Sequence, residues 1–194
     1  ATLGFSGIEA VTGGSANDTL AGLNDDSTWT VSAAGVGQYF DSGSGETLDF
    51  AGTDLLVSGS GDDTFTVASG GSVGSIDAGG GTDSLVQADG TNIWNITGVD
   101  AGDVTDVPAF SGIENLTGGS DVDTFTIGSG GNLSGAIDGG TGSDVLVQAD
   151  GNNTWNITGP DAGDTSGIGG GFSDIENLTG GSGVDTFTIA TGGS

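Results

Sequence analysis

Hydrophobic residues in this 194-residue chain recur in short alternating segments that are separated by glycine-rich turns. The segments Thr-Phe-Thr-Val (64–67) and Thr-Phe-Thr-Ile (124–127 and 186–189) place a large apolar residue at every second position, which is typical of a half-buried β-strand. Glycine clusters between the segments supply turns, because glycine accepts positive φ angles. No window has the period of an amphipathic helix. The pattern therefore predicts an all-β fold.

Aspartates recur at an almost constant spacing along most of the chain. The members of this series are Asp63, Asp83, Asp103, Asp123, Asp144, Asp164 and Asp185. Asp18 lies about twice that spacing before Asp63, which corresponds to two longer turns. The repetition predicts a parallel β-solenoid with about 20–21 residues per coil and roughly nine coils. Equivalent positions would stack about 4.8 Å apart, so we expect the aspartates to form one column.

An aliphatic residue lies seven positions before each of these aspartates. The set consists of Val11, Leu56, Ile76, Ile96, Leu116, Ile137, Ile157 and Leu178. The spacing predicts that they form the buried core. In particular, we expect Leu116, Ile137 and Ile157 to stack on one another.

A longer repeat overlies the short one. The block Phe110–Phe125 returns at Phe172–Phe187, and more loosely at Phe5–Leu20 and Phe50–Phe65. Long units therefore begin near residues 5, 50, 110 and 172, and the first is shortened and irregular around 30–49. We interpret residues 1–194 as a single β-solenoid segment that belongs to a longer protein.

All charges in the chain are negative: it has 27 acidic residues and no Lys, Arg or His. Two carboxylates about 5 Å apart repel by roughly 3 kcal/mol at an effective dielectric constant near 20. Solvent or bound metal must offset this repulsion, and oxygen ligands favour hard cations such as calcium. The lack of His and Cys excludes the usual structural zinc site. A net charge of −27 also disfavours nucleic acid and anionic membranes as partners, and no apolar run is long enough to span a bilayer.

The glycine turns carry the motif with chemical content. Gly139–Val147 and Gly180–Thr188 match G-G-x-G-x-D-x-U-x, and looser matches are Gly13–Ala21, Ser58–Thr66, Ala78–Val86 and Gly118–Thr126. These segments resemble the RTX calcium-binding nonapeptide family, whose parallel β-rolls bind calcium between stacked turns. The resemblance implies turn carbonyls and the side chains of Asp18, Asp63, Asp83, Asp123, Asp144 and Asp185 as calcium ligands. Asp103 and Asp164 are further candidates, in coils without the double glycine.

Other interpretations of the same residues stay open. The turns also fit plain solvated loops, because aspartate tolerates turn geometry. Trp29, Trp94 and Trp155 suit either core packing or stacking on neutral sugars. The Asn-x-Thr segments at Asn95, Asn115, Asn156 and Asn177 fit an asparagine ladder or glycosylation sites.

The sequence favours a structural role over catalysis. We expect a calcium-stabilised rod segment of a large secreted bacterial surface protein or adhesin, located outside the cell or on its surface. Its partners would be calcium ions and neighbouring repeats or further copies joined end to end. One alternative is a subunit of a self-assembling filament, sheath or surface layer. An alternative of another class is a carbohydrate-active or glycan-binding β-helix module.

Overall fold

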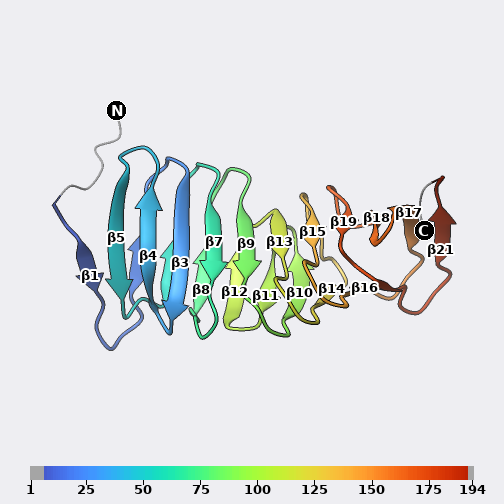
Figure 1. Ribbon diagram of the computed structural model, residues 1–194, viewed down its shortest axis with the longest axis horizontal. Coiled ribbons are helices and arrows are strands. Elements are labelled where there is room, and N and C mark those ends of the chain that lie inside the picture. Colours follow the sequence, from blue (N-terminus) through green and yellow to red (C-terminus); the bar gives the residue numbers. More distant parts are fainter. Residues whose placement is uncertain (1–6, 192–194) are drawn as a thin grey trace. The chain divides into compact units, whose positions relative to one another are not determined.

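The computed structural model describes residues 7–191, and every regular element in that range is a β-strand (Figure 1). The prediction of an all-β fold is thereby confirmed. The chain divides into two compact units. The first unit contains the described residues up to Ala88 together with Asp106–Ile113, and the second contains Asp89–Thr105 and the described residues from Glu114 onward.

In the first unit the strands lie in two sheets. One has the order β1-β5-β4-β3-β7-β9, and the other has the order β2-β6-β8-β12. The strands are β1 (Ala10–Thr12), β2 (Thr19–Ala21), β3 (Ser27–Ala33), β4 (Val36–Asp41), β5 (Glu46–Ala51), β6 (Leu55–Val57), β7 (Thr64–Val67), β8 (Ser75–Asp77), β9 (Ser84–Gln87) and β12 (Val107–Ser111).

The second unit repeats this two-sheet arrangement. One sheet has the order β13-β15-β19-β18-β17-β21, and the other has the order β11-β10-β14-β16-β20. The strands are β10 (Ile93–Gly98), β11 (Ala101–Val104), β13 (Asn115–Thr117), β14 (Thr124–Ile127), β15 (Ile137–Asp138), β16 (Val145–Gln148), β17 (Thr154–Gly159), β18 (Ala162–Thr165), β19 (Phe172–Ser173), β20 (Asn177–Thr179) and β21 (Thr186–Ile189).

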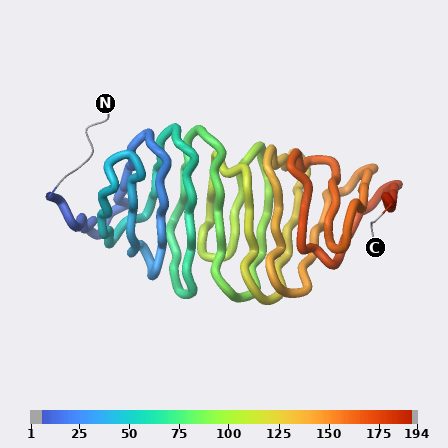
Figure 2. The backbone as a smooth tube through the Cα atoms, turned by 45° about the horizontal axis from the view of Figure 1, so that its top comes forward, coloured from blue at the N-terminus to red at the C-terminus, as the bar shows by residue number. Residues whose placement is uncertain are grey.

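Most strand pairings are parallel, and several join positions that lie one aspartate period apart. Thr64 of β7 pairs with Ser84 of β9, and these two residues directly follow Asp63 and Asp83, so they have the same spacing as the two aspartates. Leu116 of β13 pairs with Ile137 of β15, and these two residues are separated by the same number of positions as Asp123 and Asp144. Within each unit the chain crosses repeatedly between the two sheets, and the tube in Figure 2 follows these crossings. The period in the sequence is therefore a step from one strand to its parallel neighbour.

Antiparallel hairpins interrupt this regular step, and the sequence pattern did not predict them. Each tryptophan-bearing strand is followed by an antiparallel partner: β3 pairs with β4, β10 with β11, and β17 with β18. The last two hairpins have aspartate at positive φ in their loops, 50° at Asp100 and 52° at Asp161, a conformation that aspartate tolerates better than most residues. A parallel pair that spans a hairpin has a longer step, such as Ile93 with Thr124. A coil of uniform length therefore does not describe the whole chain.

The predicted core is largely buried. Leu56, Ile76, Ile96, Leu116 and Ile137 are at most 1 % exposed. Because apolar residues alternate with polar ones along each strand, these side chains fill the space between the two sheets.

One stacking prediction is wrong. Ile137 pairs with Leu116 on one side, as expected, but with Phe172 of β19 on the other. Ile157 is only half-buried and pairs with Ile189 of β21. The β17–β18 hairpin inserts extra strands at this point, so residues one period apart no longer become neighbours.

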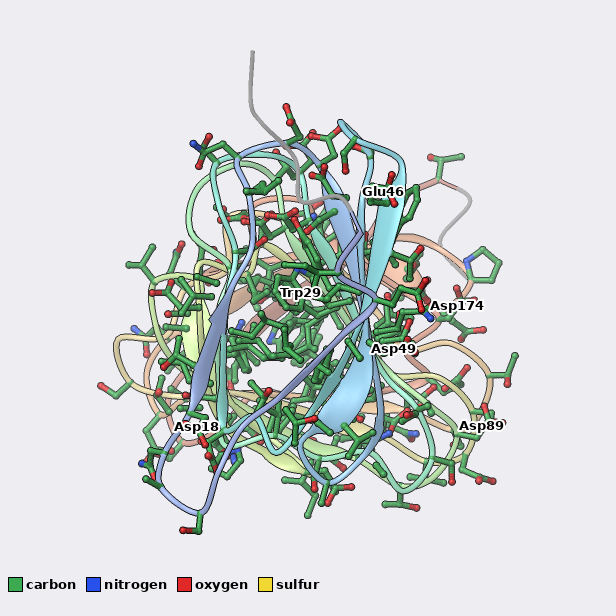
Figure 3. The ribbon with its side chains drawn as sticks, turned by 90° about the vertical axis from the view of Figure 1, so that its left-hand side faces the viewer. Asp18, Trp29, Glu46, Asp49, Asp89 and Asp174 are labelled. Carbon is green, nitrogen blue, oxygen red and sulfur yellow. The ribbon has the colours of Figure 1, made fainter. Side chains whose placement is uncertain are left out.

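The three tryptophans are part of the core. Trp29, Trp94 and Trp155 have no exposed surface, and Figure 3 shows Trp29 in the interior of the first unit. Each indole stacks on the phenylalanine of the adjacent parallel strand, with centroid distances of 5.6 Å to Phe65, 5.3 Å to Phe125 and 5.6 Å to Phe187. Buried rings offer no face to a sugar, so the packing interpretation of these residues is correct.

Candidate functional site

A row of polar residues lies at the start of neighbouring parallel strands in each unit: Ser27 is the first residue of β3, and the other members directly precede their strands. In the first unit the row is Ser27, Asp63 and Asp83, placed by the pairing of Thr28 with Thr64 and of Thr64 with Ser84. In the second unit it is Asn92, Asp123, Asp144 and Glu176, placed by the register of β10, β14, β16 and β20. We call these the first and second polar rows.

In the second polar row, the first glycine of the turn leaves the space that the row carboxylate fills. A Cβ atom on Gly118 would clash with Oδ2 of Asp123, and one on Gly139 would lie 2.9 Å from Oδ2 of Asp144. Both approaches are too close for a side chain. The glycine and the aspartate of the motif are thus two halves of one local arrangement, in which the side chain folds back into its own turn.

One oxygen of each row carboxylate accepts a backbone N–H from the previous member of the row. The N–H of Asp63 donates to Oδ1 of Asp83 at 2.7 Å. In the second row, Asn92 donates to Asp123 and Asp123 to Asp144, both at 2.7 Å, and Asp144 donates to Oε2 of Glu176 at 2.6 Å. These charge-assisted hydrogen bonds join successive strands at the point where the sheet ladder begins.

The second oxygen of several row carboxylates lacks a hydrogen-bond partner. This holds for Oδ2 of Asp63, Asp123 and Asp144, whose side chains are at most 1 % exposed. Burial raises the pKa of Asp123 to about 6, against the opposing effect of the hydrogen bonds from Asn92. Burial likewise raises the pKa of Asp63 and of Asp144. A buried carboxylate with an unsatisfied oxygen is costly unless a cation or a proton compensates it.

Asparagine shows what the centre of such a turn accepts. Nδ2 of Asn92 donates to the carbonyl oxygens of Gly90 at 2.8 Å and Gly118 at 3.1 Å. Asn153, which precedes β17, donates to Gly180 at 2.8 Å and to Ala149 and Oδ1 of Asp185 at 3.1 Å. The turn centre is therefore a cage of oxygen atoms, and the side-chain amide fills it with N–H donors.

Aspartate puts an oxygen in the place of that amide nitrogen. Oδ2 of Asp123 and the carbonyl oxygen of Gly139 both approach the point that a Cβ of Gly118 would occupy. Gly139 begins the turn after that of Asp123, just as Gly118 begins the turn after that of Asn92. Oδ2 of Asp123 therefore takes the place of the amide nitrogen of Asn92, and the carbonyl of Gly139 takes the place of the carbonyl of Gly118, but no N–H donor joins the two oxygens. An oxygen-only cage of this kind has the chemistry of a hard-cation site.

The predicted ligands do not form one column. Asp63, Asp83, Asp123 and Asp144 lie in the polar rows, whereas the remaining four lie elsewhere. Asp18 accepts the N–H of Gly14 and donates its own N–H to Asp54. Asp185 accepts the N–H of Asn153. Asp103 and Asp164 accept side-chain N–H groups across the hairpins, from Asn95 and Asn156 respectively. The hairpins carry Asp103 and Asp164 out of the rows, which is why the single column is wrong.

Sequence reasoning missed the row members that are not aspartates. Ser27, Asn92 and Glu176 each lie two positions before an inward-facing hydrophobic residue: Trp29, Trp94 and Leu178. The same spacing links Asp123 to Phe125. A search for a polar residue two positions before each core residue would have found the rows, whereas counting from one aspartate to the next did not.

A cation in these turns would be held by a carboxylate oxygen together with turn carbonyls such as that of Gly139. Within residues 7–191, no three Asp, Glu, His or Cys side chains converge as a metal cage. The geometry does not suit a cage built from carboxylates alone.

Comparison with known proteins adds no relative. No protein-family model, no curated protein and no solved structure matches the chain. Within the described residues, no helix is long and apolar enough to cross a membrane.

Proposed function

We propose that this chain is a calcium-stabilised structural segment of a large secreted bacterial surface protein or adhesin, without catalytic activity. One observation carries the proposal: buried carboxylate oxygens of Asp63, Asp123 and Asp144 have no donor, and Asp123 occupies the kind of cage that Asn92 fills with an amide. A cation in these turns would satisfy both the carboxylate and the facing carbonyl.

The mechanism is mechanical. Asp123, Asp144 and Asp83 each link a turn to the backbone of the previous strand through Oδ1. Calcium at the other oxygen would tie the same carboxylate to carbonyls of the turns. Repeated along the chain, such ties would stiffen a parallel β-solenoid, an architecture that the regular step between parallel strands supports. The expected location is outside the cell, where calcium is plentiful.

Catalysis is disfavoured by the chemistry available. The chain has no Lys, Arg or His, the residues that most often move protons or stabilise anions in enzymes. The row turns are repeated, whereas catalysis needs one unique constellation. No observation favours the glycan-binding alternative, since the tryptophans that suggested it are buried.

Thermal unfolding with and without calcium tests the proposal. A site occupied at 100 times its dissociation constant would stabilise the folded chain by about 2.7 kcal/mol. We expect the melting temperature to fall in chelator and to recover with calcium, but not with magnesium at the same concentration. Equal melting temperatures in chelator and in millimolar calcium would refute the calcium role.

A matched pair of variants locates the effect. Asp144→Asn should lower the number of bound calcium ions measured by equilibrium dialysis, because Asp144 is buried in the second polar row. Asp89→Asn removes the same charge from an exposed residue of the same unit and should leave the number unchanged. Equal losses in both variants would indicate diffuse screening by counter-ions.

A filament subunit is the second candidate, and one observation favours it. In the edge strand β21, Phe187 is 49 % exposed and Ile189 is 67 % exposed. Exposed, apolar edge strands promote pairing with another chain. Electron microscopy of the purified chain tests this candidate: ordered filaments would support it, and dispersed particles at high concentration would refute it.

A further inference from the structure

The irregular part of the first unit contains a buried acidic corner that lies largely outside the repeated turns. It is formed where loop 22–26, the 42–45 loop between β4 and β5, and turn 58–63 meet. The N–H of Ser42 donates to the carbonyl of Asp26 at 3.0 Å, and the N–H of Asp62 donates to Oδ1 of Asp26 at 2.9 Å. These contacts hold the three segments together around Asp41, a residue that no motif in the sequence indicates.

Asp41 is fully buried and only partly satisfied. Its Oδ2 accepts the N–H of Ser44 at 2.8 Å, which closes the 42–45 loop. Its Oδ1 has no hydrogen-bond partner, and none of its surface is exposed. Closing the 42–45 loop requires only Oδ2 of Asp41. The buried Oδ1 therefore indicates a further ligand.

A second carboxylate with an unsatisfied oxygen, that of Asp63 in the first polar row, lies two strands away. Asp41 of β4 pairs with Ser27 of β3, and the hydroxyl of Ser27 donates to Oδ1 of Asp63 at 2.5 Å. Oδ2 of Asp63 is also buried without a partner. Ser27 therefore stands between two buried carboxylates. Tyr39 also bonds the carboxylate of Asp41, and Ser58 that of Asp63, yet one oxygen of each carboxylate stays without a hydrogen-bond partner.

Neutral oxygens complete the surroundings. The phenolic oxygen of Tyr39 accepts the N–H of Leu23 at 3.0 Å. Burial raises the pKa of Tyr39, and the charges of Asp41 and Asp63 and a hydrogen bond to the Asp41 carboxylate raise it further. Ser58 adds a hydroxyl 3.3 Å from that of Ser27. The corner thus offers two carboxylates with tyrosine and serine oxygens, and the chain has no basic side chain to neutralise them.

We propose that this corner holds one hard divalent cation, with Asp41 and Asp63 as its charged ligands and with calcium as the best-fitting ion. Two buried carboxylates match the charge of a divalent ion. Calcium accepts six to eight oxygens in irregular geometry, whereas magnesium demands a near-ideal octahedron. The site shares Ser27 and Asp63 with the first polar row, whereas Asp41, Tyr39 and Ser58 lie outside it, so it rests only partly on the proposed function. Its role would be to fasten the β4–β5 hairpin to the regular strands.

The single tyrosine makes the site directly observable. The chain has one Tyr, so biosynthetic 3-fluorotyrosine gives one fluorine NMR resonance, at Tyr39. Titrating the full chain with calcium chloride should shift this resonance in a saturable manner. Magnesium chloride and sodium chloride at matched ionic strength should not reproduce the shift. Absence of a calcium-dependent shift, or equal shifts with sodium, would overturn the proposal.

Two variants test the ligands against a matched control. Asp41→Asn should weaken the calcium response of the fluorine resonance by about tenfold or more, a loss that even removal of an outer partner of a metal ion can cause. Glu46→Gln removes the same charge from the exposed residue that pairs with Asp41 and lies at the rim of the first unit (Figure 3). It should change the response little. An unchanged response in Asp41→Asn, or equal losses in both variants, would overturn the site.

The remaining outcomes are also decisive. If Asp41→Asn does not fold, Asp63→Asn provides the second ligand test with the same resonance and the same expected loss. Failure of this site is distinguishable from failure of the proposed function, because Asp144→Asn lies in the second unit and is read by bound calcium. A chain that loses calcium in Asp144→Asn but keeps the tyrosine response in Asp41→Asn would have calcium in the turns and a simple hairpin cap at Asp41.

Discussion

Two pairs of strands in the second unit have nearly the same sequence but different surroundings. In the β10–β14 pair, Trp94 stacks on Phe125, and Asn92 donates its backbone N–H to Asp123. In the β17–β21 pair, Trp155 stacks on Phe187, and Asn153 donates its N–H to Asp185. On its other side β14 pairs with β16, whereas β21 is an edge strand with no such neighbour among the described residues. Phe125 has no exposed surface, but Phe187 is 49 % exposed.

The comparison separates the contacts that a pair of strands forms by itself from the burial that a third strand adds. The aromatic stack and the hydrogen bond to the carboxylate form in both pairs, because they need only two strands. Complete burial of the phenylalanine and of the aspartate requires a third strand. Of the two aspartates, Asp123 has a buried oxygen without a hydrogen-bond partner, whereas Asp185 is only half-buried. The cation that we propose would therefore be needed more in the covered turn.

Removing the phenylalanine should have the largest effect. Phe125→Ala should lower the free energy of unfolding by about 3–5 kcal/mol, because it leaves a cavity in a closed core. Phe187→Ala should cost only about 1–2 kcal/mol, because half of the ring is already in water. Urea unfolding of both variants measures the difference. Equal costs would mean that the covering strand contributes little to burial.

Exchanging the amide for a carboxylate should have the next largest effect. Asn92→Asp replaces donors to Gly90 and Gly118 with an oxygen and should cost about 1–3 kcal/mol in chelator. Calcium should restore much of that loss if the turn is a cation cage. Asn153→Asp is the control and should cost less, because Asn153 is only half-buried. A loss at Asn92 that calcium does not reduce would contradict the cage.

The part of the pH dependence that Asp123 contributes should be smaller, since Asp123 is one of three row aspartates whose pKa burial raises. Burial raises the pKa of Asp123 to about 6 in the folded chain, above the ordinary value of 3.8. The folded state therefore binds more protons than the unfolded state between these values, so stability should fall as pH rises from about 4 to about 6 without calcium. Urea midpoints of wild type and Asp123→Asn in chelator measure this. A slope that persists unchanged in the variant would assign it to other acids.

Changing the edge should alter stability least. Ile189→Lys replaces a side chain that is 67 % exposed, so the free energy of unfolding should change by about 0.5 kcal/mol or less. If β21 is a docking edge, however, the variant should suppress self-association in light scattering, because a charge on an edge strand disfavours pairing. Thr179→Lys on the other edge strand, β20, is a useful second position. Self-association unaffected by either change would remove the basis for the filament alternative.

Several features of the fold could be predicted from local pattern. Alternation in Thr-Phe-Thr-Ile defines β14 and β21 as strands, and one unbroken period brings Leu116 to Ile137. The Gly118–Asp123 turn was also recognisable, because its two ends are close in sequence and contact each other. Such features depend on neighbours in sequence or on one unbroken step.

The sequence by itself determined the alternating strands such as β14 and β21, the burial of most of the predicted core and the chemistry of an acidic chain without cations. Only the tertiary structure decided which acids share a row. Asp103 and Asp164 have the right period but lie on hairpin strands, whereas Asn92 and Glu176 lack the motif but complete the second polar row. The physical reason is that a hairpin changes which strands become neighbours without changing the local alternation. Register between distant strands is set by the packing of the whole sheet, and Asp41 became a candidate ligand only when that packing buried it.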